Sequence, residues 1–223
     1  MTKTLGSSVG KKIMMAFAGL FLITFLVVHL IINSLLVFSD TEETFNIAAN
    51  FMGTNPAIKV MEIILFAGFL VHIIWGIVLQ IQNWRSRPTG YKVSTGSYTS
   101  PFSRYMIHTA IIILIFLGIH LADFYFVAKF VPHGVPEVSY GDQTVHNLAE
   151  LVIAKFQMPA YVIGYIVAFL LLGFHLYHGF QSAFQTIGLN HKSYFPVIKA
   201  VGIIYSIVIF AGFTIIPLLI YFQ

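Results

Sequence analysis

Five long apolar stretches separated by polar connections dominate the sequence. A helix needs about 20 mostly apolar residues to cross the hydrocarbon core of a bilayer, and each stretch reaches that length. The pattern therefore predicts an all-α fold, an integral membrane bundle that forms a single domain over residues 1–223. The five transmembrane helices are expected at about 13–38, 57–83, 104–130, 158–186 and 197–221.

The connections between these helices differ in character. Residues 85–101 form a polar, turn-rich linker, whereas residues 131–157 mix turn signals with "VHNLAELVIAKF", which fits a short amphipathic helix. Composition agrees with a lipid environment, because 58% of the residues are hydrophobic and only 9% are charged. A soluble domain carries about 25% charged residues. We therefore expect the lipid bilayer, and no nucleic acid, as a partner of this chain.

Charge is distributed unequally between the two sides of the predicted bundle. One side collects most of the basic residues, namely Lys3, Lys11, Lys12, Arg85, Arg87, Lys92, Arg104, Lys192 and Lys199. The other side has the basic residues Lys59, Lys129 and Lys155 and all the acidic ones, Asp40, Glu42, Glu43, Glu62, Asp123, Glu137, Asp142 and Glu150. The positive-inside rule predicts that the first side is cytoplasmic, which leaves the N-terminus inside and the C-terminus outside.

Histidines at membrane depth are the main candidates for chemistry. The chain has no cysteine and nine histidines, so imidazole is the available ligand for a redox-active metal. Four of the predicted helices carry histidine well inside the apolar run, at His29, His72, His120 and, on the fourth helix, at both His175 and His178. Ionisable groups inside a membrane are rare and usually functional, so a set spread over four helices indicates a site.

Depth along the helices predicts an inner pair. At about 1.5 Å per residue, His72 lies ~20 Å from Arg85, and His178 lies ~20 Å from His191. These two histidines therefore lie at matching depths and are predicted to face each other. His175 lies ~24 Å from the same marker. We expect it between two layers of ligands, where it hydrogen-bonds a neighbouring group instead of binding a metal.

The same calculation predicts an outer pair. His29 lies ~26 Å from Lys12, and His120 lies ~24 Å from Arg104. Two layers of paired imidazoles on facing helices suit haem iron, which is bound axially from both sides. Zinc would need three or four converging ligands, usually with carboxylate or thiolate among them, and the inner half of the bundle has no carboxylate. We therefore predict two b haems, enclosed by four of the five helices.

Residues beside the predicted ligands agree with this interpretation. Glycines next to a ligand leave room for a flat macrocycle, and phenylalanines four residues before a ligand can pack on its ring. The glycines are Gly68, Gly76, Gly118, Gly173 and Gly179, and the phenylalanines are Phe25, Phe116 and Phe174. Both residue types are common in membrane helices, so the histidines remain the stronger indication.

Four segments carry a family resemblance: "SSVGKKIMMAFAGLFLITFLVVHL", "AGFLVHIIWGIVLQ", "LGIHLADF" and "LYHGFQSAFQTIG". They resemble the dihaem cytochrome b membrane anchor of succinate dehydrogenase and fumarate reductase. More narrowly, they resemble the single-subunit, five-helix anchor of bacterial succinate:quinone oxidoreductases. The resemblance spans essentially the whole chain, and the last segment and the placement of the histidines are its most specific parts.

The resemblance implies a function within a larger enzyme of the bacterial inner membrane. A flavoprotein with the dicarboxylate site and an iron–sulfur subunit would dock on the cytoplasmic face, and we expect Arg85, Arg87 and Lys92 to take part. Electrons would pass through an inner and then an outer haem to a quinone, expected to be menaquinone. The axial ligands that the resemblance implies are His29 and His120 for the outer haem and His72 and His178 for the inner haem.

Proton transfer is expected at the outer edge of the bundle. Quinone reduction needs protons, and Glu62 and Asp123 lie near the outer ends of the second and third helices. These two acids are the candidate proton carriers of a quinone site there. Some dihaem relatives carry a glutamate two residues before the last ligand, where this chain has Leu176. That departure argues against a proton path through the bundle.

Two other classes of function remain open from the sequence. One is a free-standing dihaem transmembrane cytochrome b that moves electrons without dehydrogenase partners. The other is a transporter that uses the histidines as a proton or cation relay and binds no haem. Purification with two hydrophilic subunits would separate the anchor from the first alternative, and a haem absorbance band would exclude the second.

Overall fold

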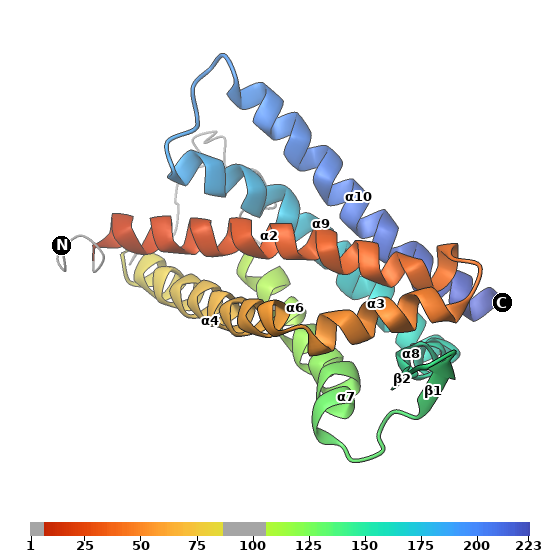
Figure 1. Cartoon of the computed structure of the whole chain (residues 1–223). Helices are drawn as coiled ribbons and strands as arrows, with labels where there is room; N and C mark the ends of the chain where they lie inside the picture. Colours follow the sequence, from red (N-terminus) through yellow and green to blue (C-terminus); the bar gives the residue numbers. More distant parts are fainter. Residues whose placement is uncertain (1–6, 87–105) are drawn as a thin grey trace.

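The computed structural model describes residues 7–86 and 106–223, and the statements below refer to these ranges. Its five long helical runs are α2 (Ser8–Phe38), α4 (Pro56–Arg85), α6–η1–α7 (Met106–His120, Leu121–Phe126 and Val127–Phe130), α9 (Pro159–Thr186) and α10 (Phe195–Phe222) (Figure 1). All five are long and apolar enough to cross a membrane. The mostly helical fold with five spans is therefore confirmed, and the expected boundaries agree to within a few residues.

Local sequence explains where these helices begin. Ser7 precedes α2, and its Oγ accepts the backbone N–H of Gly10 at 3.0 Å. Asn55 precedes α4, and its Oδ1 accepts the backbone N–H of Ala57 at 2.9 Å. Pro56 is the first residue of α4, a position where its missing N–H loses no hydrogen bond. α9 and α10 also have a proline at the first or second helical position.

Helix α2 is central to the packing of the bundle. It packs against α4, α9 and α10, and α9 packs in turn against α6 and α10. Gly202 lets α10 approach α9 closely, since a Cβ there would lie 2.7 Å from Cδ1 of Phe180. Tyr205 of α10 donates its hydroxyl to the carbonyl of Ile23 in α2 at 2.7 Å. Helix α4, in contrast, packs closely on α2 and α3 but not on α6 or α9.

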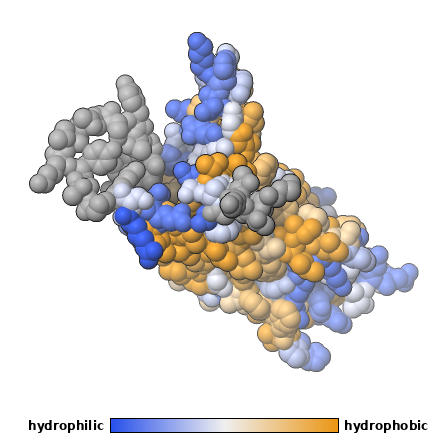
Figure 2. Space-filling model, turned by 90° about the vertical axis from the view of Figure 1, so that its left-hand side faces the viewer, coloured by the Kyte–Doolittle hydropathy of each residue, from blue (hydrophilic) through white to orange (hydrophobic). Residues whose placement is uncertain are grey.

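Large apolar side chains cover the outside of the bundle. Ile63 is 72% exposed, Ile163 is 64% exposed and Ile204 is 62% exposed. Figure 2 shows a broad apolar surface with polar residues gathered toward its ends. Exposed apolar area of this extent is stable only against lipid or another apolar surface. The chain is a multi-pass membrane protein.

The two ends of the bundle carry opposite charge. The start of α2 and the end of α4 lie at one end, which has Lys11, Lys12 and Arg85 and is called the basic end below. The end of α2 and the start of α4 lie at the other, called the acidic end, which has Asp40, Glu42 and Glu43 in its first connection.

An additional layer covers the acidic end. It consists of α3 (Glu42–Thr54), the hairpin β1 (Glu137–Tyr140) and β2 (Gln143–His146), and α8 (Leu148–Phe156), which together are called the cap (Figure 1). α8 is the short amphipathic helix expected within 131–157, and it buries Ala149, Val152 and Phe156. The sequence did not predict α3 or the hairpin, so the fold is not purely helical.

Asn46 of α3 holds the cap together. It is completely buried, yet its amide is fully used. Nδ2 donates to the Tyr140 hydroxyl at 3.0 Å and to Oδ1 of Asn147 at 2.9 Å, and Oδ1 accepts the backbone N–H of Ala149 at 2.9 Å. One side chain thereby joins α3, the hairpin and the start of α8.

Candidate functional site

His29 and His120 form a pair toward the acidic end of the bundle. Their ring centroids are 5.7 Å apart and their planes are nearly perpendicular, at 88°. The structure thus brings together the two histidines predicted as the outer pair. Phe25 stacks on His29 with 5.2 Å between centroids, and Phe116 stacks on His120 with 5.8 Å, as the spacing of four residues predicted.

His72 and His175 form a second pair, nearer the basic end. Their ring centroids are 6.2 Å apart and their planes make an angle of 74°. Gly19 of α2 lies beside this pair, and a Cβ there would be in ordinary contact with the His72 ring, 3.4 Å from Cε1. The ring of His178, one turn further along α9, lies against Tyr177 at 4.7 Å.

The choice of partner for His72 therefore differs between sequence and geometry. Depth favoured His178, whereas the ring pair in the structure is His72 with His175. The depth calculation measured His72 from one marker residue and the two histidines of α9 from another, and it ignored helix tilt. Three residues correspond to only about 4.5 Å along a helix, so a modest tilt is enough to exchange the two candidates. The assignment of the ligand itself stays a prediction.

The spacing of both pairs fits axial ligation of one metal by two imidazoles. An imidazole nitrogen binds a metal at about 2.0 Å, so two imidazoles on opposite sides of a metal hold their centroids about 6 Å apart. The observed values are 5.7 and 6.2 Å. Nδ1 of His72 and Nδ1 of His175 are also buried without a hydrogen-bond partner in the described residues. Such orphaned polar atoms are rare in proteins, so each of these two imidazoles has a polar interaction that the described residues leave unmet.

A metal site of the zinc type finds no support in the described residues. Among residues 7–86 and 106–223, no three histidine, aspartate or glutamate side chains come close enough together to hold a metal ion. Zinc is usually held by three or four protein ligands. The two-histidine sets instead fit haem, whose iron takes its equatorial ligands from the macrocycle.

The histidines of the acidic-end pair have polar neighbours at Nδ1. The hydroxyl of Tyr165 lies 3.4 Å from Nδ1 of His120. The side-chain amide of Asn33 lies 3.4 Å from Nδ1 of His29 and donates to the backbone carbonyl of the same residue at 2.8 Å. These contacts distinguish the acidic-end pair from the His72–His175 pair, whose Nδ1 atoms lack such partners in the described residues.

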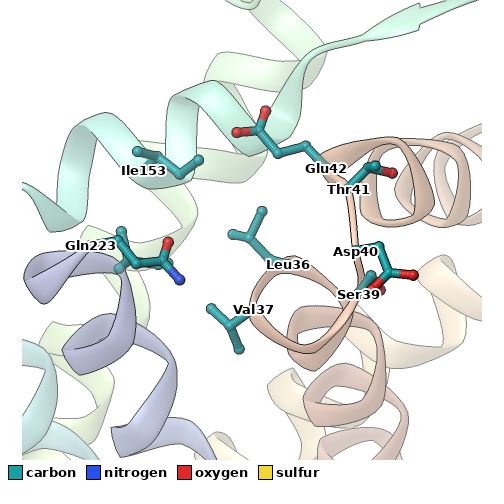
Figure 3. Close-up of a pocket in the computed structure, with 9 residues that line it drawn as sticks. Leu36, Val37, Ser39, Asp40, Thr41, Glu42, Ile153 and Gln223 are labelled. Carbon is teal, nitrogen blue, oxygen red and sulfur yellow. The ribbon is translucent and has the colours of Figure 1, made fainter.

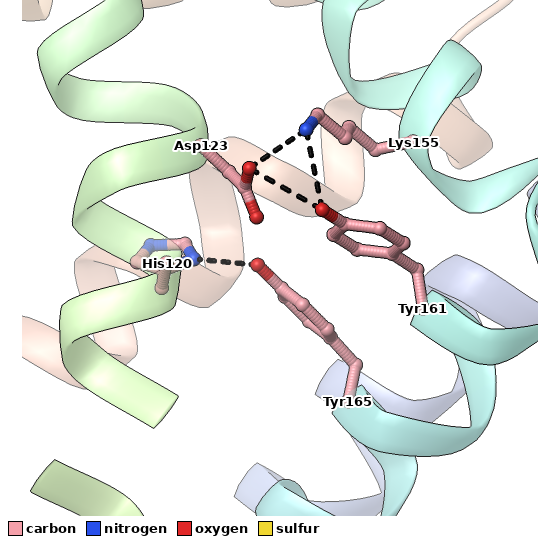
Figure 4. Close-up of polar contacts among 5 residues, drawn as sticks. All are labelled: His120, Asp123, Lys155, Tyr161 and Tyr165. Carbon is pink, nitrogen blue, oxygen red and sulfur yellow. Dashed lines mark hydrogen bonds and ion pairs between the residues drawn. The ribbon is translucent and has the colours of Figure 1, made fainter. Parts of the chain in front are cut away.

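Asp123 lies at the centre of a polar cluster beside His120 (Figure 4). It belongs to η1, a π-helical segment that begins directly after His120, and such segments often mark functional sites. Its Oδ1 accepts hydrogen bonds from Nζ of Lys155 at 2.7 Å and from the hydroxyl of Tyr161 at 3.4 Å. Its Oδ2 is buried and has no partner in the described residues.

Lys155 connects this cluster to the cap. It lies on α8, and its ammonium also donates to the Tyr161 hydroxyl at 3.3 Å. The hydrogen bond to Asp123 raises the pKa of Lys155 above its ordinary value. Lys155 therefore stays charged at physiological pH and keeps the cap attached to the bundle near His120.

Glu62 is paired differently from Asp123. Nζ of Lys129 donates to its two carboxylate oxygens at 2.6 and 2.5 Å, and the Tyr125 hydroxyl donates to Oε1 as well. Both acids that the sequence singled out thus lie in ion pairs near the acidic end. Asp123 alone of the two keeps an unpaired buried oxygen. These partners could not be recognised from the sequence, because they come from residues 32 to 67 positions away.

A separate pocket of about 210 Å³ opens at the acidic end, between the α2–α3 turn, α8 and the end of α10 (Figure 3). Asp40, Glu42 and Gln223 contribute polar groups, and Leu36 and Ile153 contribute apolar ones. None of the five membrane-depth histidines lines it. The pocket is therefore distinct from the histidine pairs.

The glycines beside the predicted ligands divide into two groups. A Cβ on Gly68 would lie 3.1 Å from Phe21, and one on Gly173 would lie 3.3 Å from Phe210, so these two glycines serve helix packing. Added Cβ atoms on Gly76 and Gly118 would meet nothing within 4 Å.

The residues expected to dock an iron–sulfur subunit are only partly described. Arg85 is the last residue of α4, whereas Arg87 and Lys92 lie outside the described residues.

Comparisons of this chain with protein-family models, with curated proteins and with solved structures gave no match. The two histidine pairs and the polar cluster around Asp123 are therefore the features on which a function can be based.

Proposed function

We propose that this chain is the membrane-anchor and electron-transfer subunit of a succinate:quinone oxidoreductase, with two bis-histidine b haems. The observation that carries the proposal is the presence of two histidine pairs at two levels of the bundle, with centroid separations of 5.7 and 6.2 Å. The resemblance of the sequence segments supports the identity of the complex. The dicarboxylate chemistry belongs to the partner flavoprotein, so this chain contributes the quinone side of the enzyme.

His29 and His120 hold the outer haem in this proposal. For the inner haem, His72 has two candidate partners on α9. The sequence motif and the depth calculation favour His178, whereas the ring contact with His72 favours His175. We adopt His175 as the ligand because two imidazoles that bind one metal must lie on either side of it, and His175 already lies at the required distance.

Each haem, when bound, supplies a carrier for one electron at a time. The chain itself places the two carriers at successive levels between the basic and the acidic end. Phe25 and Phe116 pack on His29 and His120, restrict the rotation of their rings and keep water away from them. The basic end faces the cytoplasm by the positive-inside rule, so electrons enter there from the iron–sulfur subunit and leave at the acidic end.

Quinone chemistry is proposed at the acidic end, beside the outer haem, with menaquinone as the expected substrate. Asp123 is the better of the two candidate proton carriers, since its Oδ2 is buried and unpaired in the described residues. Glu62 has both oxygens occupied by Lys129. No glutamate lies two residues before either candidate ligand, since position 173 is glycine and position 176 is leucine, which argues against proton transfer along α9.

Purification of the tagged chain from its native membrane, followed by a reduced-minus-oxidised spectrum, tests the proposal. We expect two hydrophilic subunits to accompany the chain and a b-type haem spectrum to appear. Haem without these subunits would favour the free-standing dihaem cytochrome. A chain without haem absorbance would favour a histidine relay and contradict the proposal.

A further inference from the structure

Tyr165 is held in one orientation by aromatic rings from several elements. It is only 3% exposed. Phe116 of α6, Phe156 of α8 and Phe169 of α9 contact its ring edge-to-face, with centroid distances of 4.9, 5.0 and 5.8 Å. Edge-to-face contacts of this kind are favourable and restrict the ring. The position of the phenolic hydroxyl is therefore fixed by packing, before any ligand binds.

That hydroxyl lies 3.4 Å from Nδ1 of His120. A histidine that binds a metal through one ring nitrogen carries its proton on the other, and this second nitrogen usually donates to an oxygen of the protein. The Tyr165 oxygen is thus placed to accept the Nδ1 proton of His120.

We propose that Tyr165 is the positioning residue of the acidic-end haem: its phenolic oxygen accepts the Nδ1 proton of His120 and fixes the tautomer and direction of that ligand. This inference rests on the proposed function, because it requires haem iron on His120. Acceptance of the proton makes the imidazole a stronger electron donor, which stabilises the oxidised iron and lowers the reduction potential.

The surroundings of Tyr165 also provide an acceptor for its own proton. Oδ2 of Asp123 is buried without a partner, while Oδ1 is occupied by Lys155 and Tyr161. Figure 4 shows the Asp123 carboxylate and the Tyr165 hydroxyl on the same side of His120. A hydrogen bond from Tyr165 to this oxygen would strengthen the acceptance of the His120 proton by the Tyr165 oxygen.

The second histidine pair provides an internal comparison. Nδ1 of His72 and Nδ1 of His175 have no hydrogen-bond partner in the described residues. Loss of the Tyr165 hydroxyl should therefore change one haem and leave the other as it was. Tyr161 provides a matched control, because it lies one turn earlier on α9 and its hydroxyl contacts Lys155 and Asp123 instead of His120.

Potentiometric redox titration of the purified complex tests the inference with Tyr165→Phe and Tyr161→Phe. We expect Tyr165→Phe to raise the midpoint potential of one haem and to leave that of the other unchanged. Tyr161→Phe should shift the midpoint potential of either haem by less than Tyr165→Phe shifts that of the affected haem. Equal potentials in Tyr165→Phe and the wild type, or equal shifts in the two variants, would overturn the inference.

If Tyr165→Phe loses the outer haem, the midpoint potential of that haem cannot be measured, and a further variant is needed. Tyr165→Gln keeps a hydrogen-bond acceptor near the end of the side chain. Retention of two haems by Tyr165→Gln but not by Tyr165→Phe would support the hydrogen bond, and loss from both would contradict it. A wild-type complex with no haem would overturn the proposed function itself, whereas normal haems with unmoved potentials would overturn only the role of Tyr165.

Discussion

His175 presents its ring to His72 of α4, with 6.2 Å between the two centroids. We predict that His175→Ala loses the basic-end haem and that His178→Ala retains both haems. The reason is that His175→Ala would leave His72 as the only axial imidazole at the basic-end site, which abolishes the low-spin bis-histidine state. Haem content and the low-temperature electron paramagnetic resonance spectrum of each variant measure the outcome.

The two variants serve as controls for each other, because both remove an imidazole from the same turn of α9. Loss of the basic-end haem from His178→Ala, with its retention in His175→Ala, would reverse the assignment. It would also show that the sequence motif is a better guide than ring contact in the absence of ligand.

The sequence was sufficient to find the set of membrane-depth histidines but not to choose between neighbours. Isolation in an apolar run is a local property, so His29, His72 and His120 could be recognised directly. His175 and His178 lie three residues apart and share a broad face of one helix. Which of them faces His72 depends on the tilt of α9 against α4, and the sequence does not contain that information.

At the scale of helices, Gly202 tests the close packing of α10 on α9. A Cβ at this position would lie 2.7 Å from Cδ1 and 3.2 Å from Cγ of Phe180. Because Phe180 is buried, its ring has little freedom to move away. We predict that Gly202→Ala destabilises the bundle by about 1–3 kcal/mol, the usual range for overpacking a well-filled interior.

Gly164→Ala on α9 is the matched control for this prediction. A Cβ on Gly164 meets nothing within 4 Å, so this variant reports the higher helix propensity of alanine alone. Thermal unfolding in detergent, followed by circular dichroism, compares the two variants. If Gly202→Ala is as stable as Gly164→Ala, the packing seen between α9 and α10 is wrong.

Asn46 tests the integrity of the cap. Asn46→Ala leaves the backbone N–H of Ala149 and the side chain of Asn147 without their buried partner. Each buried polar group that loses its hydrogen-bond partner lowers the free energy of unfolding by about 1–3 kcal/mol. We therefore predict local opening of the cap while the five long helices remain folded. Hydrogen exchange followed by mass spectrometry should show faster exchange in α3, the hairpin and α8, and unchanged exchange in the five long helices.

Asn50→Ala, one turn later on α3, is the control for this opening. Asn50 is partly exposed, and no side-chain hydrogen bond of its amide occurs among the described contacts. We expect its exchange to match the wild type. Unchanged protection of α8 in Asn46→Ala would mean that apolar burial, and not the Asn46 amide, holds the cap.

The elements of the cap could be predicted only in part. α8 was recognisable because its apolar residues repeat with helical spacing, which buries Ala149, Val152 and Phe156 together. α3 was missed because it is too short and too polar to read as a span and its most buried residue, Asn46, is an asparagine. Its stability comes from contacts with the hairpin and α8, which lie about 100 positions away in the sequence.

For the whole molecule, hydropathy was sufficient to locate all five spans. Each span is defined by its own length and composition, so no knowledge of its neighbours is needed. The arrangement of the spans relative to one another could not be predicted in this way. α4 packs on α2 and α3 but not closely on α6 or α9, although it shares a histidine pair with α9.

The central claim is that this bundle holds two haems, one for each histidine pair. Haem quantification by the pyridine haemochrome method on the purified chain, with protein measured by amino-acid analysis, tests it most directly. The structure has two histidine pairs, with centroid separations of 5.7 and 6.2 Å, and under the proposed function each pair would supply both axial ligands of one iron. We therefore expect about two b haems per chain. A value of one would show that one of the pairs does not bind haem, and a chain without haem would contradict the account.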